Sequence, residues 1–168
     1  MVYVVMGVAG CGKTTVGSLL AKQIHAQFID ADDYHPQINI SKIEQGVSLT
    51  DEDRLPWLKT LAEIISKYLS SGDTLVLACS ALKSKYRKIL LNGNSPEVRF
   101  IYIKCKIETA KRRVEQREGH FASSSIVDSQ FADLEEPRLA FTVDGENPIK
   151  IIVEEAVGWA QLSYKIEN

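Results

Sequence analysis

The chain has 168 residues, of which 45% are hydrophobic and 25% are charged, and its formal net charge is −2. This length and composition predict one globular domain with a sizeable core. The small net charge gives no strong field toward nucleic acid or an anionic membrane, and we expect neither as a partner. The apolar runs are too short to span a membrane. Three widely spaced cysteines, Cys11, Cys79 and Cys105, argue against a disulfide framework or a zinc site, and a cytoplasmic location is expected.

A glycine-rich motif lies near the start of the chain, between a strand pattern and a helix pattern. Residues 2–6 are apolar throughout, as expected for a strand buried on both faces of a parallel sheet. Residues 7–14 read Gly-Val-Ala-Gly-Cys-Gly-Lys-Thr and fit the P-loop pattern G-x-x-x-x-G-K-[ST]. A helix is expected to start near Lys13. The alternative is a chance match in a glycine-rich turn, which the flanking patterns argue against.

The chemistry of this motif predicts a binding site for a nucleoside triphosphate. Glycines let the backbone N–H groups point inward, and the helix adds the positive end of its dipole. Lys13 places a charge near the β- and γ-phosphates, and Thr14 offers a hydroxyl to Mg²⁺. The residues predicted to hold ATP here are Gly7, Gly10, Cys11, Gly12, Lys13, Thr14 and Thr15.

An acidic cluster follows the second expected strand, which begins at residues 28–29. Strand, helix and strand within thirty residues make a βαβ unit, and ligands of such sheets bind at the carboxyl ends of the strands. Asp30 and Asp32 are two residues apart, so in extended backbone they point the same way. One could help to hold Mg²⁺ through water while the other meets the substrate. The alternative is a polar turn that caps the strand.

The middle of the chain continues the alternation of helices and strands. A helix is expected within 37–49, with Gly46 as its stop. Thr50 is a good N-cap for a long helix, although Pro56 predicts a later start or a bend. Trp57 is expected in the core. Arg54 is either a surface charge or an anion contact.

The third strand, expected at 74–79, leads into a basic segment. Ser80 is placed to cap the next helix, and Lys83 and Arg87 are four residues apart, so they share a helix face. Positive charge near a helix N-terminus is unfavourable, which hints at an anionic partner. Two solvated charges are the alternative.

The last third of the chain predicts a lid and the end of the sheet. The fourth strand is expected at 98–103, and an arginine-rich helix, a small-residue loop and a second helix follow it. This pattern indicates a mobile lid over phosphates, at approximately 112–137, because the guanidinium fork binds two phosphate oxygens. A solvated helix face is the alternative, which we prefer for Lys111 and Arg112. A fifth strand at 139–143 and a final amphipathic helix complete the pattern.

The fold class is therefore α/β: a single-domain P-loop kinase fold with a five-stranded parallel sheet flanked by helices. Three functional classes compete: a small-molecule kinase, a switch or motor NTPase, and a nucleotide-binding module that serves a partner. The chain lacks the Asn-Lys-x-Asp and Asp-x-x-Gly motifs of guanine switches. Its third strand ends in Cys79-Ser80 where a motor ATPase usually has an acidic residue. A compact kinase is favoured.

The sequence resembles the gluconokinases of the shikimate-kinase-like group. The matching blocks are Met6-Gly7-Val8 before the P-loop, Asp30-Ala31-Asp32-Asp33-Tyr34-His35-Pro36, Asn39-Ile40 with Lys42, Leu49-Thr50-Asp51-Glu52-Asp53-Arg54, Pro56-Trp57-Leu58, Cys79-Ser80-Ala81-Leu82-Lys83 with Tyr86-Arg87, Gly119-His120-Phe121, Gln130-Phe131 and Leu134-Glu135-Glu136-Pro137. Cys11 departs from the family, where Ser or Thr is common. Because the loop works through backbone N–H groups, phosphate binding should persist.

The resemblance implies that ATP and D-gluconate give 6-phospho-D-gluconate and ADP, with Mg²⁺ as cofactor. Other small kinases, such as those that act on shikimate, share the P-loop and the acidic element, so the acceptor rests on the resemblance. A homodimer is a further prospect, with the last helix as one candidate interface, although its apolar stripe could simply cover the sheet.

The resemblance also suggests roles for individual residues. Lys13 and Asp32 are the expected catalytic residues, with Asp32 orienting the attacking hydroxyl. Thr14 and Asp30 are expected to hold Mg²⁺, Asp30 through water. The expected contacts of gluconate are Asp32, His35, Arg54, Lys83, Arg87 and His120. Arg113 and Arg117 match the lid arginines of the family and should approach ATP.

Overall fold

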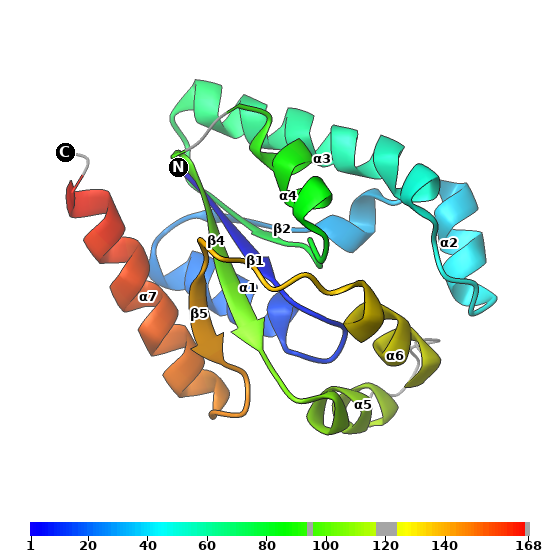
Figure 1. Ribbon diagram of the computed structural model, residues 1–168. Coiled ribbons are helices and arrows are strands. Elements are labelled where there is room, and N and C mark those ends of the chain that lie inside the picture. Colours follow the sequence, from blue (N-terminus) through cyan, green and yellow to red (C-terminus); the bar gives the residue numbers. More distant parts are fainter. Residues whose placement is uncertain (94–95, 117–123, 167–168) are drawn as a thin grey trace.

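The computed structural model describes residues 1–93, 96–116 and 124–166 (Figure 1). Within them a single parallel sheet has the strand order β2-β3-β1-β4-β5. The strands are β1 (Val2–Met6), β2 (Gln27–Asp30), β3 (Leu75–Ala78), β4 (Val98–Lys104) and β5 (Phe141–Asp144). The prediction of a five-stranded parallel sheet is confirmed.

Helices cover both faces of the sheet. They are α1 (Lys13–Gln23), α2 (Gln37–Glu44), α3 (Asp51–Ser71), α4 (Ser84–Leu91), α5 (Ile107–Glu115), α6 (Ser124–Asp133) and α7 (Ile149–Ile166), with a 3-10 helix, η1 (Ala31–Tyr34), after β2. In the part of the chain that is described, no helix combines the length and apolar character needed to cross a bilayer.

The central strand, β1, divides the core into two layers because its side chains alternate between the two faces of the sheet. Tyr3 and Val5 pack in one cluster with residues of α1 and α7. Val2, Val4 and Met6 pack in the other with residues of α3 and α4. All five side chains are buried, which agrees with the continuous apolar run of this strand.

The N-terminus of α3 is fixed by a reciprocal cap. The Thr50 hydroxyl accepts a hydrogen bond from the backbone N–H of Asp53, and the Asp53 carboxylate accepts one from the backbone N–H of Thr50. The helix therefore begins at Asp51, and Pro56 lies inside it. The prediction that Thr50 caps this helix is confirmed, and the alternative of a later start is wrong, because the cap satisfies the first turn before the proline is reached.

Helix α4 starts later than Ser80 suggested. Its N-cap is Lys83, and the backbone N–H of Ser84 donates to the carboxylate of Glu135, 2.7 Å away. Ala81 has a positive φ of 44°, which turns the chain before the helix can begin. The prediction that Ser80 caps this helix is wrong, since a distant carboxylate takes that role.

Helices α5 and α6 lie beyond the carboxyl end of β4, on the side where α2 also lies (Figure 1). Helix α6 and only the last residues of α5 fall within the predicted lid at approximately 112–137. The predicted site residues Arg117 and His120 lie outside the described residues. The lid itself stays a prediction.

Candidate active site

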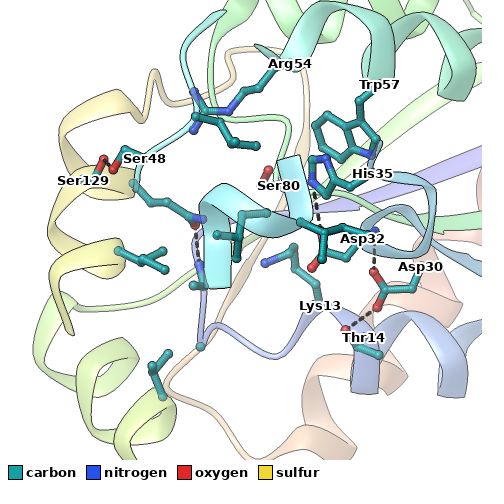
Figure 2. A pocket seen from close by; sticks show the side chains of 18 of the residues that line it. Lys13, Thr14, Asp30, Asp32, His35, Ser48, Arg54, Trp57, Ser80 and Ser129 are labelled. Atoms are coloured by element: carbon teal, nitrogen blue, oxygen red, sulfur yellow. Dashed lines mark hydrogen bonds and ion pairs between the residues drawn. The ribbon is translucent and has the colours of Figure 1, made fainter. Parts of the chain in front are cut away.

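A cavity of about 1100 Å³ opens at the carboxyl edge of the sheet. Its walls come from the P-loop, the turn after β2, the segment from α2 to α3, and α6 (Figure 2). Residues on these walls include Lys13, Thr14, Asp30, Asp32, His35, Ser48, Arg54, Trp57, Ser80 and Ser129. The position agrees with the rule that open α/β sheets bind ligands at the carboxyl ends of their strands.

The P-loop takes the backbone shape that its glycines predict. Gly10 has a positive φ of 80°, and a Cβ added there would lie 2.4 Å from the carbonyl oxygen of Ala110 in α5. A side chain at this position would therefore displace either the loop or α5. The Lys13 ammonium donates to the carbonyl oxygen of Val8, 3.0 Å away, so its side chain lies along the loop. Cys11 is fully buried, and its backbone N–H donates to the carbonyl oxygen of Val8 at 3.3 Å. Of the residues predicted to hold ATP, Gly7 and Cys11 do not line the cavity.

The hydroxyl and carboxylate predicted to hold Mg²⁺ are in contact. Thr14 Oγ1 donates to Asp30 Oδ2 at 2.7 Å, and Asp30 Oδ1 accepts from the backbone N–H of Asp32 at 3.1 Å (Figure 2). These oxygens fit Mg²⁺, which binds one or two protein oxygens together with waters and phosphates. Among the described side chains no group of three or more His, Cys, Asp or Glu could hold a metal.

His35 stands beside Asp32 and lies flat against Trp57. The two rings stack with centroids 4.2 Å apart and planes 17° from parallel. His35 Nε2 is 3.9 Å from Asp32 Oδ1. Burial, together with the nearby charge of Arg54, lowers the pKa of His35 from 6.5 to about 4. The imidazole is therefore neutral at neutral pH.

Trp57 is buried, as its place in the helix pattern predicted, but it also supports the site. Its indole N–H donates to the carbonyl oxygen of Ala31, at 2.8 Å. This bond ties α3 to the turn that carries Asp32. The same indole ring stacks on His35. Trp57 therefore holds both the backbone next to Asp32 and the imidazole of His35.

The predicted substrate cations separate into two groups. Arg54 lines the cavity, and its guanidinium is 3.5 Å from Asp133 Oδ2 of α6. Lys83 is not among the lining residues and pairs with Asp133 at 3.0 Å and with Asp51 at 3.2 Å. The hydrogen bond to Asp133 raises the pKa of Lys83 above its usual range.

Arg87 is also absent from the cavity lining. Its guanidinium donates to the carbonyl oxygens of Ala81 and Leu82, at 2.9 and 2.8 Å. These bonds brace the turn before α4. The structure thus brings His35 and Arg54 to the cavity together with Asp32, whereas Lys83 and Arg87 are not among its lining residues.

Arg113 lies on the α5 side of the P-loop. One guanidinium nitrogen, Nη2, donates to the carbonyl oxygen of Gly145 at 3.0 Å. The other, Nη1, is buried and has no hydrogen-bond partner among the described residues. Arg113 is not among the residues that line the cavity.

Gln130 reaches the P-loop from α6, a contact that the sequence did not reveal. Its side-chain oxygen accepts a hydrogen bond from the backbone N–H of Ala9 at 2.6 Å. On the same helix, Ser129 bonds to Ser48 at 3.3 Å (Figure 2). Helix α6 therefore touches both the phosphate loop and the segment between α2 and α3. Gln130 belongs to a block that resembles the family, which was the one available signal.

The P-loop, the paired aspartates and the strand order define a single-domain P-loop kinase. A model of the shikimate kinase family matches residues 9–141. The chain is 41% identical over 175 residues to a probable gluconokinase of Xenopus tropicalis, covering 94% of this chain and 92% of that protein. It is 44% identical over 136 residues to the thermosensitive gluconokinase of Escherichia coli, covering 81% and 72%.

A solved gluconokinase from Sinorhizobium meliloti superposes with a TM-score of 0.86 at 38% identity, covering 98% of this chain and 94% of that one. The chain therefore belongs to the gluconokinase family, within the shikimate-kinase-like group of P-loop kinases.

Proposed function

We propose that this protein transfers the γ-phosphoryl group of ATP to the 6-hydroxyl of D-gluconate, giving 6-phospho-D-gluconate and ADP. The observation that carries the proposal is that the P-loop lysine, Lys13, and the carboxylate of Asp32 line one cavity. The curated relatives of this chain that carry the name gluconokinase support D-gluconate as the acceptor.

Phosphate binding is assigned to the P-loop backbone and to Lys13. ATP enters with its phosphates against the loop N–H groups, and the Lys13 ammonium leaves the Val8 carbonyl for the phosphate oxygens. Thr14 and Asp30 would hold Mg²⁺, Asp30 through water, and the ion would offset charge on the β- and γ-phosphates. Arg113 is assigned to ATP on its resemblance to the lid arginines of the family, and it would have to move to reach the nucleotide, because it does not line the cavity.

Asp32 is assigned to the attacking hydroxyl. Its carboxylate orients the 6-hydroxyl and accepts its proton as the new oxygen–phosphorus bond forms. The bond from the γ-phosphorus to the bridging oxygen of ADP breaks in the same step. Because such transition states are loose, the position of the hydroxyl matters more than the basicity of the aspartate.

Arg54 is assigned to the carboxylate of gluconate, because its guanidinium lines the cavity on the wall away from the P-loop. His35 takes a hydroxyl next to Asp32. Lys83 can join Arg54 only after its ion pair with Asp133 opens, and Arg87 acts by holding the turn at residues 81–82. Closure of the lid at approximately 112–137, with Arg117 and His120, would exclude water from the reaction.

Two broader features belong to the same proposal. The three cysteines are unpaired and buried, which suits the reducing environment of the cytoplasm. The protein could also act as a homodimer. Light scattering coupled to gel filtration would give the mass of the particle and decide between one chain and two.

The test is a coupled ADP-release assay with ATP and Mg²⁺ across a small panel of acceptors. The panel contains D-gluconate, shikimate, glucose, a nucleoside monophosphate and a blank. We expect ADP release with D-gluconate, and phosphorus NMR of the product should show a phosphate ester on the terminal carbon. Turnover with another acceptor alone, or release in the blank at the same rate, would overturn the proposal.

A further inference from the structure

A buried amide lies directly behind His35. Asn39 belongs to α2, is only 1% exposed and does not line the cavity. Its Nδ2 atom is 2.9 Å from the carbonyl oxygen of Asp53 and 3.4 Å from Nδ1 of His35. The side chain therefore joins the start of α3 to the imidazole beside Asp32.

The orientation of this amide follows from the Asp53 carbonyl. A carbonyl oxygen can only accept a hydrogen bond, so the nitrogen of Asn39, and not its oxygen, must face it. The second hydrogen on that nitrogen then points to His35 Nδ1. The opposite orientation would place two acceptor oxygens together at 2.9 Å.

The amide keeps this orientation at a cost. Asn39 Oδ1 is buried without a hydrogen-bond partner among the described residues. Unsatisfied buried acceptors are uncommon in folded proteins, and an aliphatic side chain would avoid the penalty. The cost in stability therefore indicates that the amide of Asn39 has a functional role.

The benefit lies in the imidazole. A neutral imidazole carries one N–H, and because His35 Nδ1 accepts from Asn39, that hydrogen sits on Nε2. Nε2 faces Asp32 Oδ1 across 3.9 Å, which is too long for a direct hydrogen bond. A hydroxyl oxygen placed at hydrogen-bond distance from both atoms would bridge them, accepting from Nε2–H and donating to the carboxylate.

From this geometry we propose that Asn39 is a positioning residue that fixes His35 as the Nε2–H tautomer, which presents a donor to the attacking hydroxyl beside Asp32. The inference deepens the proposed function and rests on it for the identity of the hydroxyl. Asp32 and His35 thus hold the two sides of one oxygen, and the stacked ring of Trp57 sets the plane of the donor.

The start of α3 holds Asn39 in place. The Asp53 carboxylate accepts from Lys42 Nζ at 2.7 and 2.8 Å and also from the backbone N–H of Thr50. These bonds fix the position of the Asp53 backbone, whose carbonyl orients the amide. Two segments therefore act together to fix which nitrogen of His35 carries the hydrogen: Asn39-Ile40-x-Lys42 and Thr50-x-x-Asp53.

The direct test is the protonation pattern of the imidazole, read by long-range proton–nitrogen NMR on the full chain labelled at histidine. The chain has 3 histidines, and the His35→Gln variant assigns the signals of His35. We expect Nδ1 to be unprotonated and Nε2 protonated at neutral pH, without any ligand. A hydrogen on Nδ1 would overturn the inference.

The Asn39→Asp variant reverses the polarity of the contact. A carboxylate accepts from Nδ1, so the hydrogen should move to Nδ1 or the ring should become charged, with a raised pKa. The groups that face the ring are Asp32 from η1 and Arg54 from α3, and both stay in place. An unchanged nitrogen pattern in this variant would contradict the inference.

Kinetics add a readout that a purely structural role would not move. Glutamine places its amide nitrogen near the Nε2 position, whereas the shorter asparagine reaches only the Nδ1 position. We expect His35→Gln to keep at least tenfold more kcat/KM for gluconate than His35→Asn, with ATP affinity unchanged in both. Adding Asn39→Asp should cost tenfold in the wild-type background and less than twofold beside His35→Gln. Additive losses would overturn the inference.

The NMR result stands apart from the proposed function. If the chain fails to phosphorylate gluconate but His35 carries its hydrogen on Nε2, the proposed function fails and the tautomer assignment holds. If gluconate is phosphorylated and the hydrogen lies on Nδ1, only the role of Asn39 fails.

Discussion

The two walls of the cavity are built in different ways. The phosphate wall is one continuous stretch of backbone, in which Gly10 and Gly12 take positive φ values and the following helix begins at Lys13. The acceptor wall is assembled from side chains of η1, α2, α3 and α6, held by hydrogen bonds between segments. Backbone N–H groups suit the phosphates of ATP, which are the same whatever the acceptor. Side chains suit the acceptor, because substitutions in them can change which acceptor is bound.

The largest expected effect comes from Asp32 of the acceptor wall. Asp32→Asn keeps the shape of the side chain but removes the charge that accepts the proton. We expect turnover with gluconate to fall by about 10²–10⁴-fold, while the Kd for ATP changes less than twofold because the phosphate wall is intact. Steady-state kinetics and equilibrium nucleotide binding measure the two quantities. Near-normal turnover would remove Asp32 from catalysis.

A second variant breaks the phosphate wall itself. Gly10→Ala introduces a Cβ where the Ala110 carbonyl is 2.4 Å away, at a φ of 80°. We expect ATP binding to weaken at least tenfold and the melting temperature to fall. Gly46→Ala is the matched control, because Gly46 has a φ of 72° with nothing within 4 Å of the added Cβ. The free energy of unfolding of this control should fall only by the cost of a left-handed non-glycine residue, about 1–2 kcal/mol. Equal losses in the two variants would contradict the steric argument.

The contrast between the walls explains what the sequence could predict. The P-loop and the strands depend on short-range patterns, and their predicted positions agree with the structure. The expectation that Asp30 and Asp32 point the same way from extended backbone is wrong, because Asp32 lies in the 3-10 helix η1 and Asp30 is its N-cap. Both residues nevertheless line the cavity. The surroundings of Lys83 and Arg87 depend on Asp133 and on the turn at Ala81, which are set by packing between distant segments. Helical spacing therefore could not tell which cation faces the cavity.

The contacts of Gln130 and Asn39 were missed for the same reason. Each joins segments that are far apart in the chain or separated by a turn, and neither residue type has a chemical role by itself. For α3 the prediction of Thr50 as N-cap is confirmed. Of the two alternatives drawn from Pro56, the later start is wrong, because the cap of Thr50 and Asp53 fixes the first turn at Asp51.

Gln130 offers a way to test how far the phosphate wall depends on a side chain. Gln130→Leu removes the acceptor for the Ala9 N–H and keeps a similar volume. Since one hydrogen bond contributes about 0.5–1.5 kcal/mol, we expect the KM for ATP to rise by roughly three- to tenfold. Ser129→Ala, on the same helix, is the control and should leave the KM for ATP unchanged. If the KM for gluconate alone rises, α6 belongs to the acceptor wall only.

We expect Asp133 to compete with gluconate for the cations at the acceptor wall. Its carboxylate binds Arg54 and Lys83, the cations expected to bind the carboxylate of gluconate. Asp133→Asn removes this competitor, so we expect the KM for gluconate to fall about two- to fivefold, the range for a partly exposed ion pair. Asp128→Asn is the matched control, because Asp128 pairs with Lys111 and does not line the cavity. A rise in KM would show that Asp133 supports the site and does not compete for it.

The last prediction concerns stability against pH. The pKa of His35 is about 4 in the folded protein and 6.5 without its surroundings. Between these values the unfolded chain binds more protons, so stability should fall as pH falls from 6.5 to about 4. His35→Gln should show a shallower loss in denaturant titrations across this range. Parallel losses in the two proteins would show that His35 is not held neutral.

The most direct test of the two-wall arrangement is a crystal structure with Mg²⁺, a non-hydrolysable ATP analogue and D-gluconate bound together. We predict that the 6-hydroxyl lies within hydrogen-bond distance of Asp32 and His35, next to the γ-phosphate, with the carboxylate of gluconate at Arg54. Gluconate bound with its carboxylate toward Asp32, or held outside the cavity by Lys83 and Arg87, would contradict the assignment of the acceptor wall.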